Sequence, residues 1–397
     1  HLSDFKIAEL DLPENAKEIE VKSITSDSRN SSEDCMFIAI KGNNQDGHDF
    51  IDEAISAGAS NILVDYNYKN NAKIPVSKAK NVRRALALIS AIYYNNQPDT
   101  IAAVTGTNGK TSVCSFLKQI WEKSNFTTAS LGTLGLITTP KFNPLKKIRD
   151  RLTTLDPINL HSCISHLKLN GINRLALEAS SHGLEQHRLD GVKISLACFT
   201  NLSHDHLDYH KDFAAYRDVK KMFFDQLPKN AFALTNSDDK NGKYMLQNTN
   251  AKKYTYALKS IADYKSQVLE NQFNGLLLKI NGQELWVKLI GNFNAYNLLA
   301  IYAVADLLGL ENLEILQLMS ELESVDGRFQ YVVSKNNITA IVDYAHTPDA
   351  LKNILETINA IRSKNEDLIT IVGCGGDRDV DKRPKMGNIA ASLSSKV

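Results

Sequence analysis

The segment Thr105-Gly-Thr-Asn-Gly-Lys-Thr111 contains the residue types of a phosphate-binding loop. In such a loop, backbone N–H groups and a helix N-terminus face an anion, a lysine meets the outer phosphates, and a hydroxyl meets Mg²⁺. Val104 occupies the place where the general pattern has its first glycine. A Gly-Lys turn without a ligand is the alternative, which the strand and helix expected on either side disfavour. The residues at the required positions are Gly106, Gly109, Lys110 and Thr111.

Histidine and aspartate are concentrated in the segment Asn201-Leu-Ser-His-Asp-His-Leu-Asp-Tyr-His210. Three histidines and two aspartates within residues 204–210 are typical of a metal site. The run comes close to the HxHxDH pattern of metallo-β-lactamase-type hydrolases, except that Tyr209 separates the last aspartate from the last histidine. A polar loop whose histidines cap helices or bind backbone groups is the alternative.

A third polar cluster, Glu178-Ala-Ser-Ser-His-Gly-Leu-Glu-Gln-His-Arg188, follows an apolar run. A carboxylate at the end of a strand can reach a metal beside the phosphate loop, so Glu178 is a candidate Mg²⁺ ligand. Ser180, Gln186 and Arg188 can bind an anionic or polar substrate, whereas an ordinary surface turn is the alternative. Lys220, taken alone, is expected to be a solvated helix lysine.

Three weaker motifs lie further along the chain. Gly291-Asn-Phe-Asn-Ala-Tyr-Asn297 is expected to be a loop entering a helix, with asparagines that either cap the helix or face a base. Asp343-Tyr-Ala-His-Thr-Pro348 and Gly373-Cys-Gly-Gly-Asp-Arg-Asp379 each follow an expected strand, which is where ligands bind in α/β sheets. Plain turn chemistry is the alternative for both.

The elements around these motifs predict a mostly parallel sheet with its chemistry at the carboxyl ends of the strands. The expected strands are Ile101–Val104, Arg174–Glu178 and Leu196–Thr200. After the phosphate loop, apolar residues recur at helical spacing at positions 113, 116, 117, 120 and 121. Residues 253–290 are expected to form an antiparallel excursion, and Asn297–Leu308 a helix ended by Gly309.

The two ends of the chain are expected to form separate α/β domains. The first ~95 residues contain short apolar runs at 36–40 and 61–64 and a helical segment, Ala85–Tyr94, which Asn95–Pro98 ends. After Arg328 the pattern predicts a strand, a helix, a strand and a helix, at Ile338–Val342, Pro348–Ile361, Leu368–Val372 and Met386–Leu393. A parallel sheet so small has a thin core. We therefore expect the natural chain to continue past Val397. Because the sequence opens with His1 and not with methionine, we also expect it to begin earlier.

Composition excludes several classes of protein. The 397 residues include 46 basic and 45 acidic side chains, so a net charge of +1 provides no general attraction for nucleic acids or acidic membranes. The sequence contains no apolar run of membrane-spanning length, and residues 1–20 lack the charged-then-apolar layout that is typical of a signal peptide. The five scattered cysteines argue against a disulfide framework and a zinc ribbon, which favours a reducing compartment, the cytoplasm.

In their order along the chain, these motifs resemble the Mur ligase family, and most closely its UDP-N-acetylmuramoyl-tripeptide synthetase branch. Asp27-Ser-Arg29 and Asp46-Gly-His48 add to the resemblance, which covers essentially the whole chain. It implies an α/β fold with a central P-loop-type parallel sheet and an incomplete Rossmann-like C-terminal domain. The implied domains are 1–97 for the UDP-sugar, 98–328 for ATP and 329–397 for the incoming amino acid.

The resemblance also implies residue roles. ATP contacts fall on Gly106, Thr107, Asn108, Gly109, Lys110, Thr111, Ser112, Asn294, Asn297, Arg328, Asp343 and His346. UDP-sugar and dipeptide contacts fall on Ser26, Ser28, Asn43, Asn44, Gln45, Thr153, Thr154, Ser180, Gln186 and Arg188. The Mg²⁺ environment comprises Thr111, Glu178, His206 and Lys220, the last as an N-carboxylated lysine, and the catalytic set is Lys110, Lys220, His206 and Glu178. Arg383 would bind the amino acid's carboxylate.

The implied reaction is ATP-dependent ligation of meso-diaminopimelate to UDP-N-acetylmuramoyl-L-alanyl-D-glutamate by a cytoplasmic monomer, in peptidoglycan biosynthesis and so in cell wall biogenesis, cell shape and division. L-Lysine is the alternative acceptor, because the family's Asp-Asn-Pro-Arg-type motif does not occur before residue 397. Asp326 replaces the family's usual proline before Gly327-Arg328. A folylpolyglutamate synthase-like ligase, a metallohydrolase and a non-catalytic ATP-binding module are the other hypotheses.

Overall fold

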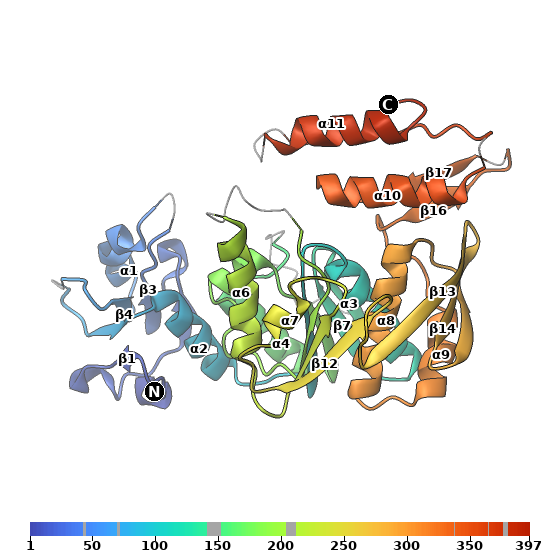
Figure 1. The fold of residues 1–397 in the computed structure, drawn as a ribbon. Helices are drawn as coiled ribbons and strands as arrows, with labels where there is room; N and C mark the ends of the chain where they lie inside the picture. The colour runs from blue at the N-terminus through green and yellow to red at the C-terminus, as the bar shows by residue number, and fades with distance from the viewer. Residues whose placement is uncertain are drawn as a thin grey trace. The chain divides into compact units, whose positions relative to one another are not determined.

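The computed structural model describes residues 1–42, 45–69, 72–140, 152–203, 212–336, 338–363, 365–375 and 380–397 (Figure 1). These residues form two compact units. The first holds the described residues of His1–Pro98, Pro144–Gly171 and His182–Lys193. The second holds those of Asp99–Asn143, Ile172–Ser181 and Ile194–Val397. No helix in the described ranges is both long and apolar enough to cross a membrane.

The first unit is built on a five-stranded sheet with the order β1-β5-β4-β3-β2. Its strands are β1 (Leu10–Asp11), β2 (Ser23–Thr25), β3 (Cys35–Ile38), β4 (Ala59–Asp65) and β5 (Val76–Ala79). Only β1 runs antiparallel to its neighbour. All four residues of β3 are buried because separate apolar clusters cover its two faces. This explains the continuous apolar run in the sequence.

Helices α1 (Ile51–Ser56) and α2 (Val82–Tyr94) each contribute to one of these clusters. Asn81 caps α2 by accepting a hydrogen bond from Arg84 N, and Asn95 ends it in the left-handed conformation. Helix α4 (Pro157–Leu169) packs against α2. A Cβ atom at Gly191 would lie 2.5 Å from Ala91 Cβ, so only glycine allows this approach to α2.

The second unit contains a ten-stranded sheet with the order β15-β14-β13-β12-β11-β10-β6-β9-β7-β8. Pairing is parallel from β13 to β7 and antiparallel at both edges. This confirms the predicted α/β class. The strands are β6 (Thr100–Thr105), β7 (Thr128–Gly132), β8 (Gly135–Thr139), β9 (Arg174–Glu178), β10 (Leu196–Phe199), β11 (Phe232–Asn236), β12 (Lys252–Ala257), β13 (Tyr264–Gln272), β14 (Gly275–Ile280) and β15 (Gln283–Val287).

The predicted antiparallel excursion is confirmed for β13–β15, whereas β12 pairs with both of its neighbours in parallel. Up to residue 320, the helices described in this unit are α3 (Lys110–Lys123), α6 (Phe213–Asp225), α7 (Gly242–Met245), α8 (Asn292–Leu307) and α9 (Asn312–Ser320). The short α5 (Ser181–Glu185) joins the two units in sequence. Helix α8 is almost wholly buried between Asn294 and Ala305 and packs against α3.

The prediction that Gly291–Asn297 is a loop is wrong, because α8 already begins at Asn292. No side chain caps the N-terminus of this helix. The residue before it, Gly291, has φ +95° and is not one of the Ser, Thr, Asp or Asn residues that usually mark a helix start in a sequence. Asn294 and Asn297 are buried inside the helix, where they hydrogen-bond to each other. Their polarity therefore does not mark a loop.

The end of the chain forms a small antiparallel sheet of β16 (Gln330–Val333) and β17 (Thr339–Val342), followed by α10 (Pro348–Ile361) and α11 (Lys382–Leu393). Helix α10 has the predicted bounds and lies alongside α11 (Figure 1). The strand predicted at Leu368–Val372 is wrong. Of these residues only Ile369 makes a bridge, to Lys396, and no described strand lies beside the segment to complete a ladder.

Candidate nucleotide and metal site

The predicted phosphate loop connects β6 to α3, at the carboxyl edge of the central strands. Gly106 has φ +149° and Gly109 has φ +88°, a region that side-chain-bearing residues rarely adopt. A Cβ atom at Gly106 would lie 2.0 Å from Thr200 Oγ1. Both glycines are therefore required by the backbone path, independently of any ligand.

Residues after β10 hold the phosphate loop from one side. Asn201 Oδ1 accepts a hydrogen bond from Asn108 N at 3.0 Å, and Asn201 O accepts one from Thr107 N at 2.8 Å. Thr200 Oγ1 donates to Asn108 O at 2.6 Å. Two loop N–H groups are thus used within the protein, which orients the loop before any anion arrives. The sequence placed Asn201 at the head of a metal-binding segment and did not predict this role.

Lys110 and Thr111 open α3, where their side chains face different partners. The Lys110 ammonium donates to Gly106 O at 2.9 Å and Thr107 O at 2.8 Å, so it lies over the loop. Thr111 Oγ1 accepts a hydrogen bond from Arg328 Nη2 at 3.1 Å, and both Thr111 and Ser112 are buried. The structure therefore brings Arg328 to the loop across more than two hundred residues of sequence.

Glu178, the last residue of β9, is 1% exposed. Its carboxylate accepts hydrogen bonds from Thr133 N at 2.9 Å and Thr133 Oγ1 at 3.1 Å. A Cβ atom at Gly132 would lie 2.1 Å from Glu178 Oε1, so the glycine leaves room for the carboxylate. Burial raises the pKa of the Cys114 thiol; Glu178 raises it further and Lys110 lowers it. The charges of Glu178 and Lys110 therefore both act on the buried Cys114 thiol.

Lys220 also reaches this edge of the sheet. Its side chain is 1% exposed, and its ammonium donates to Gly106 O at 3.3 Å and Thr105 Oγ1 at 3.4 Å. The ammonium also lies 4.7 Å from the centre of the Tyr216 ring. The expectation of a solvated helix lysine is wrong, because α6 presents Lys220 on its buried face.

The oxygen donors at this edge suit Mg²⁺, which prefers carboxylate and hydroxyl ligands. Thr111 and Glu178 supply one donor of each kind, both from buried side chains. No three His, Cys, Asp or Glu side chains cluster as a metal site among the residues that the structure describes. His206 and the rest of Asp205–His210 lie outside those residues.

The predicted adenine contacts, Asn294 and Asn297, are buried near the start of α8. Asn297 Nδ2 donates to Asn294 Oδ1 at 3.1 Å, and Asn294 Nδ2 donates to Ile290 O at 2.8 Å. Asn297 Oδ1 lies only 2.6 Å from the position of a Cβ atom at Gly109. Helix α8 therefore abuts the phosphate loop at Gly109, where Thr200 Cγ2 also lies within 3.7 Å of the same Cβ position.

The candidate residues after Gly327 belong to the second unit, as the phosphate loop does. The Arg328 guanidinium carbon lies 4.7 Å from the centre of the Tyr344 ring, and Asp343 Oδ2 accepts a hydrogen bond from Phe329 N at 2.7 Å. Burial raises the pKa of the Asp343 carboxyl, against the lowering effects of Phe329 N–H and Arg328. His346 Nδ1 lies 3.0 Å from Tyr344 O. Arg383 Nη2 donates to Gly375 O at 3.2 Å, and residues 376–379 lie outside the described ranges.

In the first unit, the structure brings together three of the predicted dipeptide contacts. Arg188 donates to Thr154 O at 2.6 Å and to Gln186 Oε1 at 2.8 Å. Thr153 is half-buried beside Thr154. Ser180 is half-buried two residues after β9, in the second unit.

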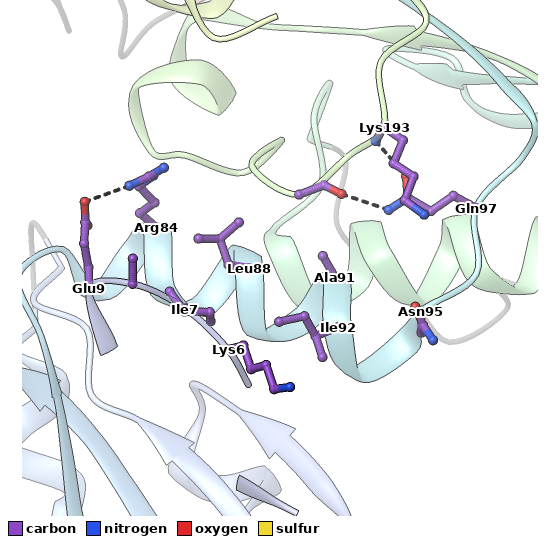
Figure 2. Close-up of a pocket in the computed structure, with 12 residues that line it drawn as sticks. Lys6, Ile7, Glu9, Arg84, Leu88, Ala91, Ile92, Asn95, Gln97 and Lys193 are labelled. Carbon is purple, nitrogen blue, oxygen red and sulfur yellow. Dashed lines mark hydrogen bonds and ion pairs between the residues drawn. The ribbon is translucent and has the colours of Figure 1, made fainter. Parts of the chain in front are cut away.

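Of the predicted uridine contacts, Ser28 is buried and donates to Glu53 Oε2 at 2.8 Å. Ser26 and Gln45 are exposed, and Asn43 and Asn44 lie outside the described residues. A separate cavity of about 370 Å³ in this unit is lined by residues 6–9, one face of α2, and residues near Gly191 (Figure 2). None of the predicted site residues lines it.

Comparison with protein families gives three consecutive matches. Residues 20–100 match the Mur ligase family catalytic domain, residues 104–305 the Mur ligase middle domain, and residues 327–397 the Mur ligase glutamate ligase domain.

Curated relatives include UDP-N-acetylmuramoyl-L-alanyl-D-glutamate–2,6-diaminopimelate ligases. The Cytophaga hutchinsonii protein is 42% identical over 384 residues, covering 96% of this chain and 78% of the relative. The Phocaeicola vulgatus protein is 43% identical over 384 residues, covering 95% and 78%. A solved structure with the same enzyme name has a TM-score of 0.75 at 30% identity, covering 94% of this chain and 77% of the other. A Thermotoga maritima MurF ligase in complex with ADP shares the fold, with a TM-score of 0.63 at 19% identity over 96% of this chain and 84% of that one.

Proposed function

Because the chain belongs to the Mur ligase family, we propose that it is an ATP-dependent amide-bond ligase of peptidoglycan biosynthesis. Its reaction adds a diamino acid to UDP-N-acetylmuramoyl-L-alanyl-D-glutamate. The observation that carries this proposal is the combination at one sheet edge of a preorganised phosphate loop, a buried Glu178 and a buried Lys220. Relatives above 40% identity that are named for 2,6-diaminopimelate support meso-diaminopimelate as the acceptor, with L-lysine as the alternative.

The chemistry requires an activated acid, since a carboxylate at neutral pH is a poor electrophile. A side-chain carboxylate oxygen of the D-glutamate attacks the γ-phosphorus of ATP, ADP leaves, and an acyl phosphate results. The acceptor's amine then attacks the acyl carbon, phosphate leaves, and an amide forms. Lys110 disperses charge on the transferring phosphoryl group, and the remaining loop N–H groups orient the phosphates.

One Mg²⁺, with Thr111 as a ligand, would neutralise phosphate charge, and a second, held by His206, Glu178 and carbamylated Lys220, would orient the D-glutamate carboxylate. Lys220 enters this site as a carbamate: its amine adds CO₂ and releases one proton. The modification replaces a cation with an anionic oxygen donor, which suits a hard metal. The burial of Lys220 beside Gly106 O supports a role at the phosphate loop.

The same proposal assigns roles to the other parts of the chain. Residues 1–97 bind the UDP-sugar through Ser26, Ser28 and residues 43–45. The dipeptide contacts are Thr153, Thr154, Ser180, Gln186 and Arg188. Residues 98–328 bind ATP, with Asn294, Asn297 and Arg328 at the nucleotide. Residues 329–397 supply Asp343 and His346 to ATP and Arg383 to the amino acid. The enzyme is a cytoplasmic monomer.

The test is phosphate release by the full-length protein with ATP, Mg²⁺ and UDP-N-acetylmuramoyl-L-alanyl-D-glutamate. Meso-diaminopimelate and L-lysine are offered separately. We expect release that requires the precursor and diaminopimelate together and that a Lys110→Ala variant abolishes. Release with a folate and glutamate instead would identify a folylpolyglutamate synthase-like ligase. ATP binding without release under any condition would leave a nucleotide-binding module.

A further inference from the structure

Strand β11 ends in the turn Asn236-Ser-Asp-Asp239, whose polar side chains brace the neighbouring segments. Asn236 Nδ2 donates to Thr200 O at 2.9 Å, and Asp239 Oδ2 accepts a hydrogen bond from Leu202 N at 2.7 Å. These bonds fix the segment after β10, which in turn holds Asn108 of the phosphate loop. The turn therefore supports the segment that holds one side of the loop.

Asp238, between these two residues, has other partners and accepts four hydrogen bonds. Its donors are Leu258 N at 2.8 Å, Lys259 N at 2.9 Å, Ser260 N at 2.7 Å and Tyr296 Oη at 2.9 Å. Burial opposes ionisation here, but the hydrogen bonds from Ser260, Lys259 and Tyr296 lower the pKa of the Asp238 carboxyl well below its usual value. Every partner is a donor, so the site is specific for a carboxylate.

Tyr296 links this carboxylate to the nucleotide site. It belongs to the second turn of α8 and directly precedes Asn297. Asn297 Oδ1 lies against Gly109 of the phosphate loop, at 2.6 Å from the position of a Cβ atom there. A helix whose first turns are held at Tyr296 cannot rotate or slide without moving Asn297.

We propose that Asp238 is a positioning residue for the nucleotide: through Tyr296 it holds the start of α8 in register with the phosphate loop, and so sets the affinity for ATP without touching it. This inference rests on the proposed function, because it requires ATP at the phosphate loop. A purely structural role would lower stability and affect all substrates alike. A positioning role changes KM for ATP alone.

The test compares three variants of the full-length protein. Tyr296→Phe removes only the hydroxyl that bonds to Asp238. Asp238→Asn keeps the size of the side chain but replaces one carboxylate oxygen with an NH₂ group, which cannot accept the hydrogen bonds that the surrounding groups donate. Asp263→Asn is the matched control, because Asp263 also accepts two hydrogen bonds, from Thr255 N at 2.8 Å and Thr255 Oγ1 at 2.7 Å, and among the described residues it makes no hydrogen bond to α8.

Steady-state kinetics give kcat and KM for each substrate, and titration with a fluorescent ATP analogue gives the dissociation constant. Loss of one hydrogen bond to a charged group predicts that KM for ATP rises about tenfold in Tyr296→Phe and Asp238→Asn. We expect kcat and KM for the UDP-precursor to stay within about twofold, and Asp263→Asn to match the wild type.

Unchanged KM for ATP in Tyr296→Phe would overturn the inference even if Asp238→Asn fails to fold. A parallel rise of every KM, or an equal effect of Asp263→Asn, would also overturn it. A wild-type protein that binds no ATP would refute the proposed function itself, and the inference with it.

Discussion

Replacing Gly132 with alanine should displace the Glu178 carboxylate. The new Cβ atom would lie 2.1 Å from Glu178 Oε1 and 2.4 Å from its Cδ atom. Nonbonded carbon atoms need about 3.5–4.0 Å, so the carboxylate must move by roughly 1 Å. The movement would break its bonds to Thr133 N and Thr133 Oγ1, which measure 2.9 and 3.1 Å.

Two magnitudes follow from this displacement. Overpacking a buried site lowers the free energy of unfolding by about 1–3 kcal/mol. Misplacing a group of the reaction site by about 1 Å lowers turnover by about 10²-fold. If Glu178 is a Mg²⁺ ligand, the Mg²⁺ concentration for half-maximal activity must also rise.

The assay measures ADP formation against Mg²⁺ concentration at saturating substrates, together with urea unfolding. Gly135→Ala is the matched control in the same hairpin. Gly135 has φ +80° and nothing within 4 Å of a Cβ atom, so alanine costs about 1–2 kcal/mol of backbone strain without a collision. Wild-type turnover and Mg²⁺ dependence in Gly132→Ala would contradict a role of Glu178 as a Mg²⁺ ligand, as would an equal loss of activity in Gly135→Ala.

Three further predictions concern other residues. Lys110→Ala should abolish binding of a fluorescent ATP analogue while lowering the free energy of unfolding by no more than about 1–3 kcal/mol, for the lost bonds to Gly106 O and Thr107 O; retained binding would exclude the loop as the nucleotide site. Lys220→Ala should lose ligase activity and regain part of it with small carboxylic acids that replace the carbamate, whereas full activity without them would refute the carbamate. Burial lowers the pKa of His161 to about 4. Its neutral form stabilises the fold fully above pH 6.5, and up to about 3 kcal/mol is lost as pH falls from 6.5 toward 4. Urea unfolding of wild type and His161→Asn at pH 7 and 4.5 checks this, and equal pH dependence of the two would contradict it.

The local part of the nucleotide site could be predicted from the sequence. The apolar run before Thr105, the two glycines and the helical spacing after Lys110 all lie within one short segment, so each signal supports the next. The strand at Arg174–Glu178 has its predicted bounds for the same reason. Local sequence periodicity is therefore sufficient to predict elements that are buried on both faces.

The groups that complete the site could not be predicted from local pattern, because their partners are distant in sequence, and Lys220 was assigned to it only through the family resemblance. An amphipathic pattern does not show what the buried face of α6 meets, so Lys220 could not be distinguished from a solvated lysine. Asn201 resembles any other polar residue until β10 is known to lie beside β6. The start of α8 was also missed, because its asparagines satisfy each other inside the helix.

The strand order has a consequence for how the chain matures during synthesis. β6 and the phosphate loop leave the ribosome early, but both strands that flank β6 come later, β9 at residues 174–178 and β10 at 196–199. Until residue 201 has been made, Asn108 lacks the side chain that orients its N–H group. A nascent chain can therefore contain the complete phosphate-loop motif before the loop has the conformation that would bind a nucleotide. Long-range pairing of this kind is slow and leaves apolar strand edges exposed meanwhile. If the phosphate loop binds ATP as proposed, the central position of β6 makes ATP binding a late event in folding that depends on closure of the sheet.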